Sequence, residues 1–303
     1  MQKGERIWLD GQLVAWDAAQ VHVLTHTLHY GLGVFEGIRC YECHDGRSAI
    51  FRLREHIDRL YGSAHVLDLP IPYPRDAIMA ACVETVRANK LRECYLRPLV
   101  FMGDGEMGLA AQPPTRVAIA AWPWGAYLGD EGMRNGIRVK TSSFARFHPN
   151  TLLTKSKAVG HYVNSILASR EARSAGYDEA LLLDVDGYVS EASGENIFIV
   201  AEGVVKTTPL PTVLAGITRH AILRVLADLG TPVREERFTR DEIYLADEAF
   251  FTGTAAEVTP IRELDGRRIG DGRPGTMTRR LQETFFAMVR GRDDRYRSWL
   301  AYV

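Results

Sequence analysis

The amino-acid sequence predicts an α+β fold in which mainly antiparallel sheets are packed against helices. Short strand-like runs flank tight turns at Asp10-Gly11 and Asp186-Gly187, and such turns favour hairpins of antiparallel strands. Apolar residues recur at helical spacing in only a few segments, among them residues 53–68. The regular alternation of strands and helices that a doubly wound parallel sheet requires is missing from the pattern.

Strand-like runs dominate the first half of the chain, with two helical segments among them. The first helix is indicated by Leu53, Ile57, Leu60 and Ala64, which would share one face. The expected strands cover residues 5–9, 12–16, 33–41, 48–52, 93–102 and 116–122, and the expected helices cover residues 53–68 and 75–90.

The second half mixes strands and helices more evenly. Glycine residues mark the ends of two of its helices, at Gly176 and Gly230. The expected strands lie near residues 137–142, 179–184, 188–191, 196–200, 203–207, 232–237 and 248–252. The expected helices cover residues 158–175, 217–229 and 275–290, with a short helix after Thr239.

Glycine and other turn-forming residues are concentrated between Trp122 and Gly136, between two strand-like runs. This composition is typical of a linker. We therefore expect a small α/β domain at residues 1–124, an interdomain linker at residues 125–136 and a large domain at residues 137–303.

Composition excludes several classes of function. The 303 residues are 46% hydrophobic and carry a net charge of −1, which is ordinary for a globular protein. The sequence has no run of Lys and Arg that would bind nucleic acid, no segment long enough to cross a membrane and no apolar stretch typical of a signal peptide near its start. We expect a protein of the cytosol with neither nucleic acid nor membrane as a partner.

Metal and redox chemistry receive little support. His22, His26 and His29 could share one side of a helix, but no acidic ligand lies near them. Cys40-x-x-Cys43 has redox spacing, yet it lies in a strand-like run without a second pair, which favours a structural role. We expect no metal site and no disulfide framework.

Two segments could bind an anion. At Gly216-Ile217-Thr218 a glycine precedes the free amides of a helix start, and such amides bind phosphate. The small residues of 252–256 follow a strand and could form a nest of backbone N–H groups. A plain helix cap and a simple turn are the alternatives, and local sequence alone favours them. Local sequence also does not distinguish Lys155 or Lys157 from surface lysines.

The order of several motifs carries a stronger signal. Nearly end to end, the chain resembles the branched-chain amino acid aminotransferases, which belong to the fold-type IV group of pyridoxal 5'-phosphate (PLP) enzymes. The motifs that carry the resemblance are His29-Tyr30-Gly31, Val34-Phe35-Glu36-Gly37-Ile38-Arg39, Arg54-Glu55-His56 with Arg59-Leu60, Tyr95-Leu96-Arg97-Pro98, Pro123-Trp124-Gly125-Ala126-Tyr127, Pro149-Asn150-Thr151, Lys157-Ala158, Gly187-Tyr188-Val189-Ser190-Glu191, Ser193-Gly194-Glu195-Asn196, Gly216-Ile217-Thr218-Arg219 and Gly253-Thr254-Ala255-Ala256-Glu257.

The resemblance implies a two-domain fold similar to D-amino acid aminotransferase, with PLP as cofactor. It implies that Lys157 binds the cofactor's aldehyde and is the catalytic residue, with Lys155 as the one rival lysine. Glu191 matches the carboxylate that keeps the pyridine nitrogen protonated, and Tyr162 matches the partner of the ring oxygen O3′. Arg59, Gly216, Ile217, Thr218 and Thr254 match the family's phosphate-binding positions, and Leu214 matches a residue packed on the ring.

The resemblance also implies a substrate pocket. Seven positions match this pocket, most of them as an aromatic or apolar wall and Gly37 as the place that leaves room beside it. They are Tyr30, Phe35, Gly37, Tyr95, Leu109, Trp124 and Tyr127. Ala255 and Ala256 match the amides that receive the α-carboxylate. Arg97 matches the partner of the distal carboxylate of glutamate, and a structural ion pair is its alternative role.

The implied reaction is transamination of the branched-chain L-amino acids leucine, isoleucine and valine with 2-oxoglutarate. The amino donor and the 2-oxo acid acceptor would be its small-molecule partners. A D-amino acid or (R)-amine aminotransferase, an aminodeoxychorismate lyase and a non-enzymatic PLP-binding protein stay as alternatives. The loop at Met107-Gly108-Leu109 matches one that reaches a neighbouring subunit, which implies a homo-oligomer, either a dimer or a trimer of dimers. Departures at Phe147-His148, Lys155-Ser156, Val159, His161 and residues 207–214 put the substrate range in question.

Overall fold

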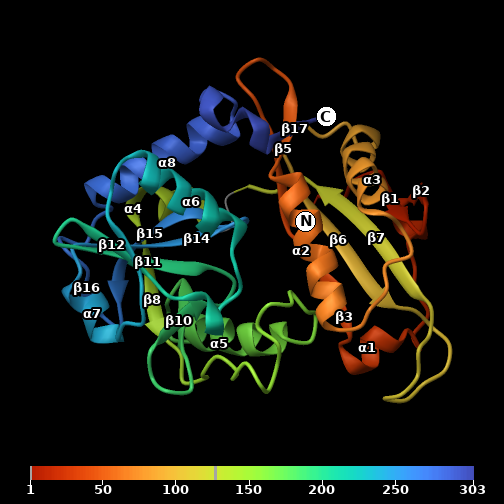
Figure 1. The fold of residues 1–303 in the computed structure, drawn as a ribbon, viewed down its shortest axis with the longest axis horizontal. Coiled ribbons are helices and arrows are strands. Elements are labelled where there is room, and N and C mark those ends of the chain that lie inside the picture. Colours follow the sequence, from red (N-terminus) through yellow and green to blue (C-terminus); the bar gives the residue numbers. More distant parts are fainter. Residues whose placement is uncertain (1, 126–127) are drawn as a thin grey trace. The chain divides into compact units, whose positions relative to one another are not determined.

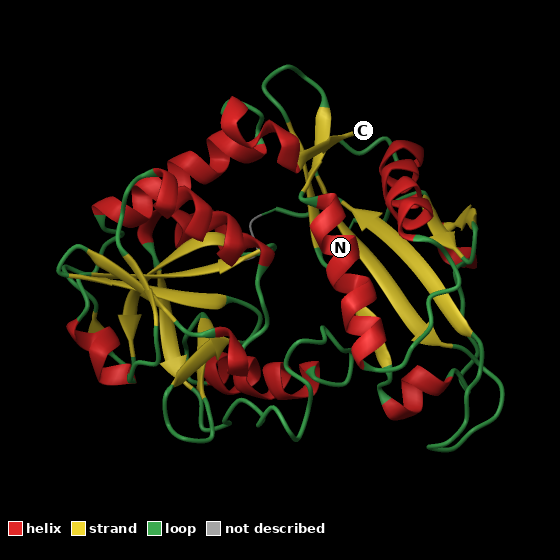
Figure 2. Ribbon diagram, viewed as in Figure 1, coloured by secondary structure: helices red, strands yellow, loops and turns green. Residues whose placement is uncertain are grey.

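The computed structural model describes residues 2–125 and 128–303. The chain forms two compact units, which can be followed by colour in Figure 1. Unit 1 consists of Met1–Trp124, Lys155–Gly160 and Ala287–Val303, and unit 2 consists of Gly125–Thr154 and His161–Phe286. Each unit has a sheet of its own with helices packed on it (Figure 2).

Unit 1 contains an eight-stranded antiparallel sheet. Its strands are β1 (Arg6–Leu9), β2 (Gln12–Ala15), β3 (Gly33–Phe35), β4 (Ile38–Glu42), β5 (Ser48–Phe51), β6 (Cys94–Met102), β7 (Thr115–Trp122) and β17 (Leu300–Tyr302). They run in the order β17-β5-β4-β6-β7-β1-β2, and β3 also pairs with β6. Asp10 and Gly11 join β1 to β2 with positive φ angles of 47° and 97°, as a tight hairpin turn requires.

Helices α2 (Leu53–Val66) and α3 (Arg75–Ala88) pack on each other and on this sheet (Figure 1). Ile57 and Leu60 of α2, Ile78 of α3 and Ile119 of β7 are fully buried in one cluster. The spacing of Ile57 and Leu60 belongs to the pattern that predicted α2. A short helix α1 (His26–Tyr30) and two 3-10 helices, Trp16–Ala18 and Asp294–Trp299, complete the unit.

The segment Lys155–Gly160 belongs to unit 1 because it pairs with β3. Ala158 forms a bridge with Val34. The amide of Val159 donates to the carbonyl of Gly33 (2.8 Å), and the amide of Phe35 donates to the carbonyl of Lys157 (3.1 Å). These bonds pair the backbone around Ala158 with β3, and residues 159–161 form a turn. The helix predicted at residues 158–175 therefore begins later, at Tyr162.

Unit 2 contains a nine-stranded mixed sheet. Its strands are β8 (Ile137–Thr141), β9 (Glu179–Leu183), β10 (Val189–Ala192), β11 (Asn196–Ala201), β12 (Val204–Thr207), β13 (Val233–Glu235), β14 (Glu248–Gly253), β15 (Glu257–Leu264) and β16 (Arg267–Arg268). The order is β10-β9-β8-β15-β14-β11-β12-β13, and β16 pairs with β15. The pairs of β8 with β9, β8 with β15 and β12 with β13 are parallel, and the others are antiparallel.

The helices of unit 2 are α4 (Gly129–Asn135), α5 (Tyr162–Ser174), α6 (Ile217–Asp228), α7 (Arg240–Leu245) and α8 (Thr276–Val289), with a 3-10 helix at Leu210–Thr212. Strand β9 is buried on both faces. Its Leu182 packs with Ala168 and Ala172 of α5, whereas its Leu181 lies in another cluster with Ile243 of α7. Successive side chains of a strand point to opposite faces, so this uninterrupted apolar run belongs to a strand covered on both sides.

The predicted α+β class with mainly antiparallel sheets is confirmed. Besides the later start of α5, two local expectations were wrong. The predicted strand 33–41 is interrupted at Glu36-Gly37, because β3 and β4 pair with different stretches of β6. Strand β15 was not expected, since Pro260 breaks its strand-like pattern, yet long-range pairing with β14 and β8 holds it. Residues 129–135 of the predicted linker are helical, and their role as a linker stays a prediction.

The predicted domain boundaries at residues 124 and 136 stay a prediction, because spatial units are not a measure of independent folding. The two units divide the chain differently from the predicted domains at the segment that contains Lys157. Residues 155–160, which include Lys157, lie in unit 1 and not with the rest of residues 137–303.

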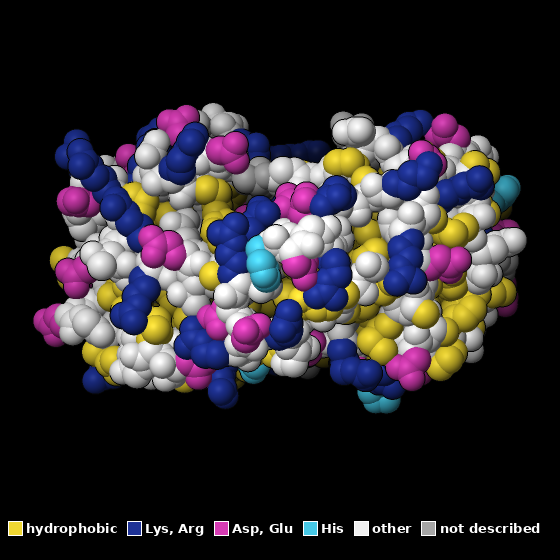
Figure 3. Space-filling model, turned by 90° about the horizontal axis from the view of Figure 1, so that it is seen from above, with side chains coloured by type: hydrophobic (Ala, Val, Ile, Leu, Met, Phe, Trp, Pro, Cys, Tyr) yellow, Lys and Arg dark blue, Asp and Glu magenta, His cyan; other side chains and the backbone are white. Residues whose placement is uncertain are grey.

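Within residues 2–125 and 128–303, no helix is long and apolar enough to cross a membrane. On the face shown in Figure 3, Lys and Arg side chains are interspersed with Asp and Glu side chains. The four cysteines, Cys40, Cys43, Cys82 and Cys94, are buried with free thiols.

The paired rings of Phe198 and Phe250 give a test of the core of unit 2. The two residues lie opposite each other on β11 and β14, and their rings stack at 5.1 Å. Both are fully buried, so Phe198→Ala should lower the free energy of unfolding by roughly 3–5 kcal/mol. Urea unfolding followed by circular dichroism measures the loss. Leu245→Ala, at a residue 83% exposed, is the control and should change little; a loss below about 1 kcal/mol for Phe198→Ala would contradict the packing.

Candidate functional site

Lys157 has a fixed backbone and a half-buried side chain in unit 1. Its amide donates to Ser63 Oγ of α2 at 3.0 Å, and the hydroxyl of the preceding Ser156 donates to the carbonyl of Ser63 at 3.0 Å. Lys157 Nζ lies 5.2 Å from the centroid of the Phe35 ring. The rival Lys155 is exposed. Of the two lysines, Lys157 is therefore the less exposed one, and its amine lies against an aromatic ring.

Arg59 is held by a buried carboxylate in the same unit. Its Nε and Nη2 donate to the two oxygens of Glu36 at 2.6 and 2.9 Å, and Glu36 is fully buried. The Nδ1 atom of buried His56 lies 2.7 Å from Glu36 Oε2. The fork geometry fixes the plane of the guanidinium, which is the condition for recognising a phosphate group.

Burial and charge act in opposite directions on this cluster. Burial by itself would raise the pKa of Glu36, but the positive charge of Arg59 and the contacts with His56 outweigh it, and the pKa falls well below its usual range. Burial lowers the pKa of His56, and the neighbouring Glu36 only partly opposes that effect. At neutral pH the cluster therefore contains an ionised Glu36 and a neutral His56.

An aromatic cluster surrounds Arg97 on β6. The Arg97 guanidinium lies 4.7 Å from the ring centre of Phe35 and 5.3 Å from that of Tyr95. The rings of Tyr95 and Trp124 meet edge to face at 4.4 Å. A Cβ atom at Gly37 would overlap the Tyr95 hydroxyl, so glycine is required there. Of the predicted pocket, Phe35, Gly37, Tyr95, Arg97 and Trp124 are thus brought together.

Three further residues of the predicted pocket, Tyr30, Leu109 and Tyr127, are not part of this aromatic cluster as the structure describes it. Tyr30 of α1 is 43% exposed, and Leu109 is 90% exposed in the loop after β6. His26 joins the two segments, since its Nε2 lies 3.0 Å from the carbonyl of Gly108. Tyr127 is outside the described residues.

The histidines near α1 contact backbone atoms rather than one another's side chains. His29 Nε2 lies 2.8 Å from the carbonyl of Val23, and His22 Nδ1 accepts from the amide of Leu24. In the part of the chain that the structure describes, no three His, Cys, Asp or Glu side chains form a group that could hold a metal.

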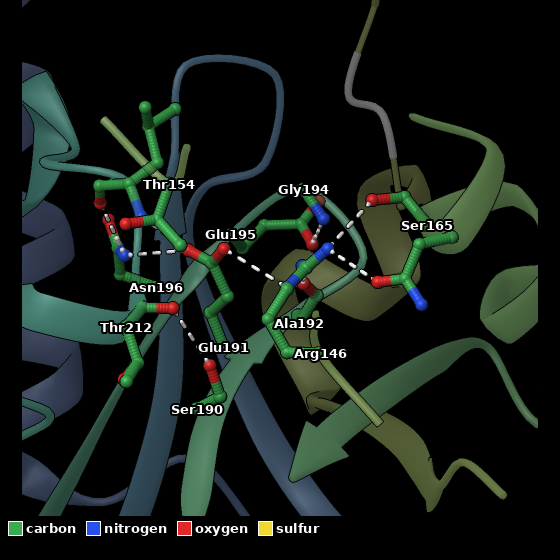
Figure 4. Close-up of polar contacts among 12 residues, drawn as sticks. Arg146, Thr154, Ser165, Ser190, Glu191, Ala192, Gly194, Glu195, Asn196 and Thr212 are labelled. Atoms are coloured by element: carbon green, nitrogen blue, oxygen red, sulfur yellow. Dashed lines mark hydrogen bonds and ion pairs between the residues drawn. The ribbon is translucent and has the colours of Figure 1, made fainter. Parts of the chain in front are cut away.

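Both carboxylate oxygens of Glu191, on β10, have polar partners in unit 2 (Figure 4). Its Oε1 lies 3.2 Å from Arg146 Nε. Its Oε2 accepts from Asn196 Nδ2 at 3.3 Å and from the amide of Leu214 at 3.2 Å. The carboxylate is thus fixed in position and paired with a cation.

The start of α6 presents backbone amides without a side-chain cap. Gly216 is the N-cap residue in extended conformation, and among the described residues no side chain caps the helix. A Cβ atom at Gly216 would overlap Asn196 Oδ1. Ile217 and Thr218 follow as the first helical residues, and their amides lack partners within the helix. Such amides, together with the helix dipole, favour an anion.

The loop at Thr254, Ala255 and Ala256 closes the hairpin of β14 and β15. Gly253 pairs with Glu257, which has a positive φ of 56°. The hydroxyl of Thr259 donates to the carbonyl of Ala256 at 2.6 Å and so fixes the turn. The backbone amides of such a turn can act as an anion nest.

Four residues of these clusters had no role assigned from the sequence. Glu36, His56 and Asn196 lie inside quoted motifs, and that is the sequence signal that could have singled them out. Arg146 gave no local signal, because its partners are 18 to 46 residues away in the chain.

Tyr162 is the first residue of α5 and Leu214 precedes α6, both in unit 2.

The Glu36 cluster predicts acid sensitivity. Both Glu36 and His56 bind protons more weakly in the folded chain, since their pKa values are lowered. Unfolding therefore takes up protons, and stability should fall as the pH drops below the usual histidine value of 6.5 and fall further below the usual glutamate value of 4.5. Glu36→Gln should cost about 3 kcal/mol at neutral pH because it removes the buried carboxylate that compensates the charge of Arg59.

Unfolding of the cofactor-free protein between pH 2.5 and pH 8 measures the effect. The gap between the wild type and Glu36→Gln should narrow below pH 4.5, where the wild type loses the Glu36 contribution. Glu42→Gln, which removes an exposed partner of Arg92, is the matched control and should follow the wild type at every pH. A gap of constant size would overturn the assignment of an ionised Glu36.

Known proteins resemble this chain over its full length. A model of the family described as amino-transferase class IV matches residues 33–264. The branched-chain-amino-acid aminotransferase of Pseudomonas aeruginosa is 54% identical over 298 residues, covering 98% of this chain and 97% of the relative. The enzyme of the same name from Escherichia coli K12 is 47% identical over 307 residues, covering 100% and 98%.

Solved structures agree with these relatives. A branched-chain amino acid aminotransferase from T.th., crystallised with pyridoxamine 5'-phosphate, has a TM-score of 0.96 and 49% identity, covering 100% of this chain and 99% of the other. The Escherichia coli enzyme has a TM-score of 0.96 and 47% identity, covering 98% and 99%. The family resemblance expected from the motifs is confirmed.

The side chains suit the group that this family binds. Arg59 and the uncapped start of α6 are the kinds of group that bind phosphate, and a paired, partly buried carboxylate such as Glu191 suits a protonated ring nitrogen. The chain belongs to the class IV aminotransferases and, within them, to the branched-chain amino acid aminotransferases, whose cofactor is pyridoxal 5'-phosphate.

Proposed function

We propose that the protein transfers the amino group of L-leucine, L-isoleucine or L-valine to 2-oxoglutarate, giving branched 2-oxo acids and L-glutamate. The observation that carries the proposal is Lys157, whose backbone is fixed between α2 and β3 and whose amine lies against Phe35. An amine in this setting suits both covalent attachment of the PLP aldehyde and proton transfer.

We assign the cofactor contacts residue by residue. Arg59, Ile217, Thr218 and Thr254 bind the phosphate, and Gly216 allows the close approach of the backbone. Tyr162 donates a hydrogen bond to the ring oxygen O3′, and Leu214 packs on the ring. Glu191 accepts a hydrogen bond from the protonated ring nitrogen.

PLP supplies an electron sink that stabilises negative charge on the substrate Cα. The protein's part is to orient the substrate and move one proton. Lys157 Nζ takes the proton from Cα as general base and delivers it as general acid to the carbon that the aldehyde occupied. The paired carboxylate of Glu191 keeps the ring nitrogen positive while charge develops.

Substrate selection rests on two kinds of residue. Apolar surface for a branched side chain comes from one group of residues: Tyr30, Phe35, Gly37, Tyr95, Leu109, Trp124 and Tyr127. Arg97 binds the distal carboxylate of glutamate, and the amides of Ala255 and Ala256 receive the α-carboxylate. Solved structures of the T.th. enzyme are complexed with N-(5'-phosphopyridoxyl)-L-glutamate and with 4-methylvaleric acid, which supports one pocket for both kinds of acid.

The alternatives within fold type IV are less well supported. The aromatic cluster around Arg97 favours a substrate pair of branched and dicarboxylic acids over a D-amino acid, an (R)-amine or a lyase substrate. A homo-oligomer, as a dimer or a trimer of dimers, and a place in the cytosol stay predictions from the sequence.

Replacing Lys157 tests the central assignment. Purified wild-type protein should be yellow, and borohydride should fix the cofactor on Lys157 as seen by mass spectrometry. Lys157→Ala should lower kcat for L-leucine by at least about 1,000-fold, because both attachment and proton transfer are lost. Lys155→Ala is the matched control and should keep colour and activity. A colourless wild type, or a Lys157→Ala variant with full activity, would exclude the proposal.

Replacing Arg97 tests the substrate pair. Arg97→Met should lower kcat/KM for L-glutamate roughly 10- to 100-fold through loss of a charged hydrogen bond, with a change of less than about 5-fold for L-leucine. Arg116→Met is the control, since Arg116 also lies against a ring, at 5.5 Å from that of Phe101. The wild type should use L-leucine and not D-alanine or (R)-1-phenylethylamine. Preference for either of the latter, or equal losses for leucine and glutamate, would contradict the assignment.

A further inference from the structure

Arg146 is a buried arginine in the loop that follows β8. It is 4% exposed, and its amide donates to the carbonyl of Leu183 at 2.7 Å. Its guanidinium contacts two elements of unit 2, α5 and β10 (Figure 4). Nη1 donates to Asn164 Oδ1 (3.1 Å) and Ser165 Oγ (3.2 Å) of α5, and Nη2 donates to the carbonyl of Ala192 (2.7 Å). These bonds prevent the guanidinium from moving.

The third contact is with the carboxylate of Glu191. Arg146 Nε lies 3.2 Å from Glu191 Oε1, but within the described residues the Nε–H group has no aligned hydrogen-bond acceptor. The contact is therefore an ion pair at short range. The directed bonds of Arg146 go to α5 and β10, while its charge acts on Glu191.

The opposite side of Glu191 is held by neutral donors. Asn196 Nδ2 and the amide of Leu214 both bond Oε2, and Asn196 Nδ2 also donates to the carbonyl of Leu214 at 3.1 Å. One oxygen is thus bonded twice and the other faces a cation. An ionised carboxylate accepts hydrogen bonds and donates none, so its natural partner on a ligand is an N–H group.

We propose that Arg146 is a positioning residue that keeps the Glu191 carboxylate charged and correctly oriented for the ring nitrogen of the cofactor. The inference rests on the proposed role of Glu191. A carboxylate largely removed from water needs a nearby cation, and without Arg146 it would turn away or take up a proton. Preorganised charge is the form of stabilisation that costs no rearrangement during the reaction.

A double-mutant cycle tests this role on the full-length enzyme. Arg146→Gln should raise the dissociation constant for PLP about 10-fold and slow a single turnover with L-leucine roughly 10- to 100-fold. Because Arg146 acts through Glu191, the double variant Arg146→Gln/Glu191→Gln should differ from Glu191→Gln alone by less than about 3-fold in both quantities. Absorbance titration of cofactor-free protein and stopped-flow spectroscopy give the two readouts.

A purely structural role would give a different pattern. Melting temperature would fall in both backgrounds, and the PLP dissociation constant of the folded Arg146→Gln variant would stay at the wild-type value. That result, or losses that multiply in the double variant, would overturn the proposal. If Arg146→Gln does not fold, Arg146→Met, which also removes the charge, carries the same cycle.

Arg237→Gln is the matched control. Arg237 pairs with Asp184 and Asp186 in the turn that joins β9 to β10, at 2.8 and 2.7 Å, and in the described part of the chain neither ion pair involves a residue assigned to the cofactor. It should leave PLP affinity and turnover unchanged. Failure of the proposed function would appear separately, as a wild type that neither binds PLP nor uses L-leucine.

Discussion

A buried carboxylate that must keep a cationic partner determines the local structure in both units. In unit 1, Glu36 is fully buried and fixes the fork of Arg59. In unit 2, Arg146 faces Glu191 while Asn196 and the Leu214 amide bond its other oxygen. Breaking such a pair leaves an uncompensated charge, which costs far more than losing a surface ion pair.

The two pairs use opposite arrangements. Glu36 is the buried support, and Arg59 is the group left available at the edge, with 14% of its side chain exposed. In the other pair Arg146 is the buried support, and Glu191 is the more exposed member at 12% against 5%. In each case the functional group is the one nearer to solvent, and its partner supplies orientation and opposite charge. This division follows from the need to prepare a charged group before its ligand arrives.

Sequence could predict the features that depend on local pattern. Alternation, helical spacing and turn residues indicated most strands and helices, and the ordered motifs indicated the family. It could not predict that Ala158 pairs with Val34, because that bridge joins residues 124 positions apart. The bridge delays the start of α5 to Tyr162 and places Lys157 beside Phe35. Arg146 was missed for a related reason, since nothing near it in the chain shows that its partners are Glu191 and Ala192.

The role of Gly216 shows how packing gives meaning to a motif that sequence left open. From sequence, Gly216-Ile217-Thr218 could be a plain helix cap. In the structure the place of a Gly216 side chain is taken by Asn196 Oδ1, while Nδ2 of the same amide bonds Glu191 and the carbonyl of Leu214. One buried amide thus fixes both the carboxylate and the turn that leads into α6. A larger residue at position 216 would displace that amide, so the anion-binding helix start and the Glu191 carboxylate cannot vary independently.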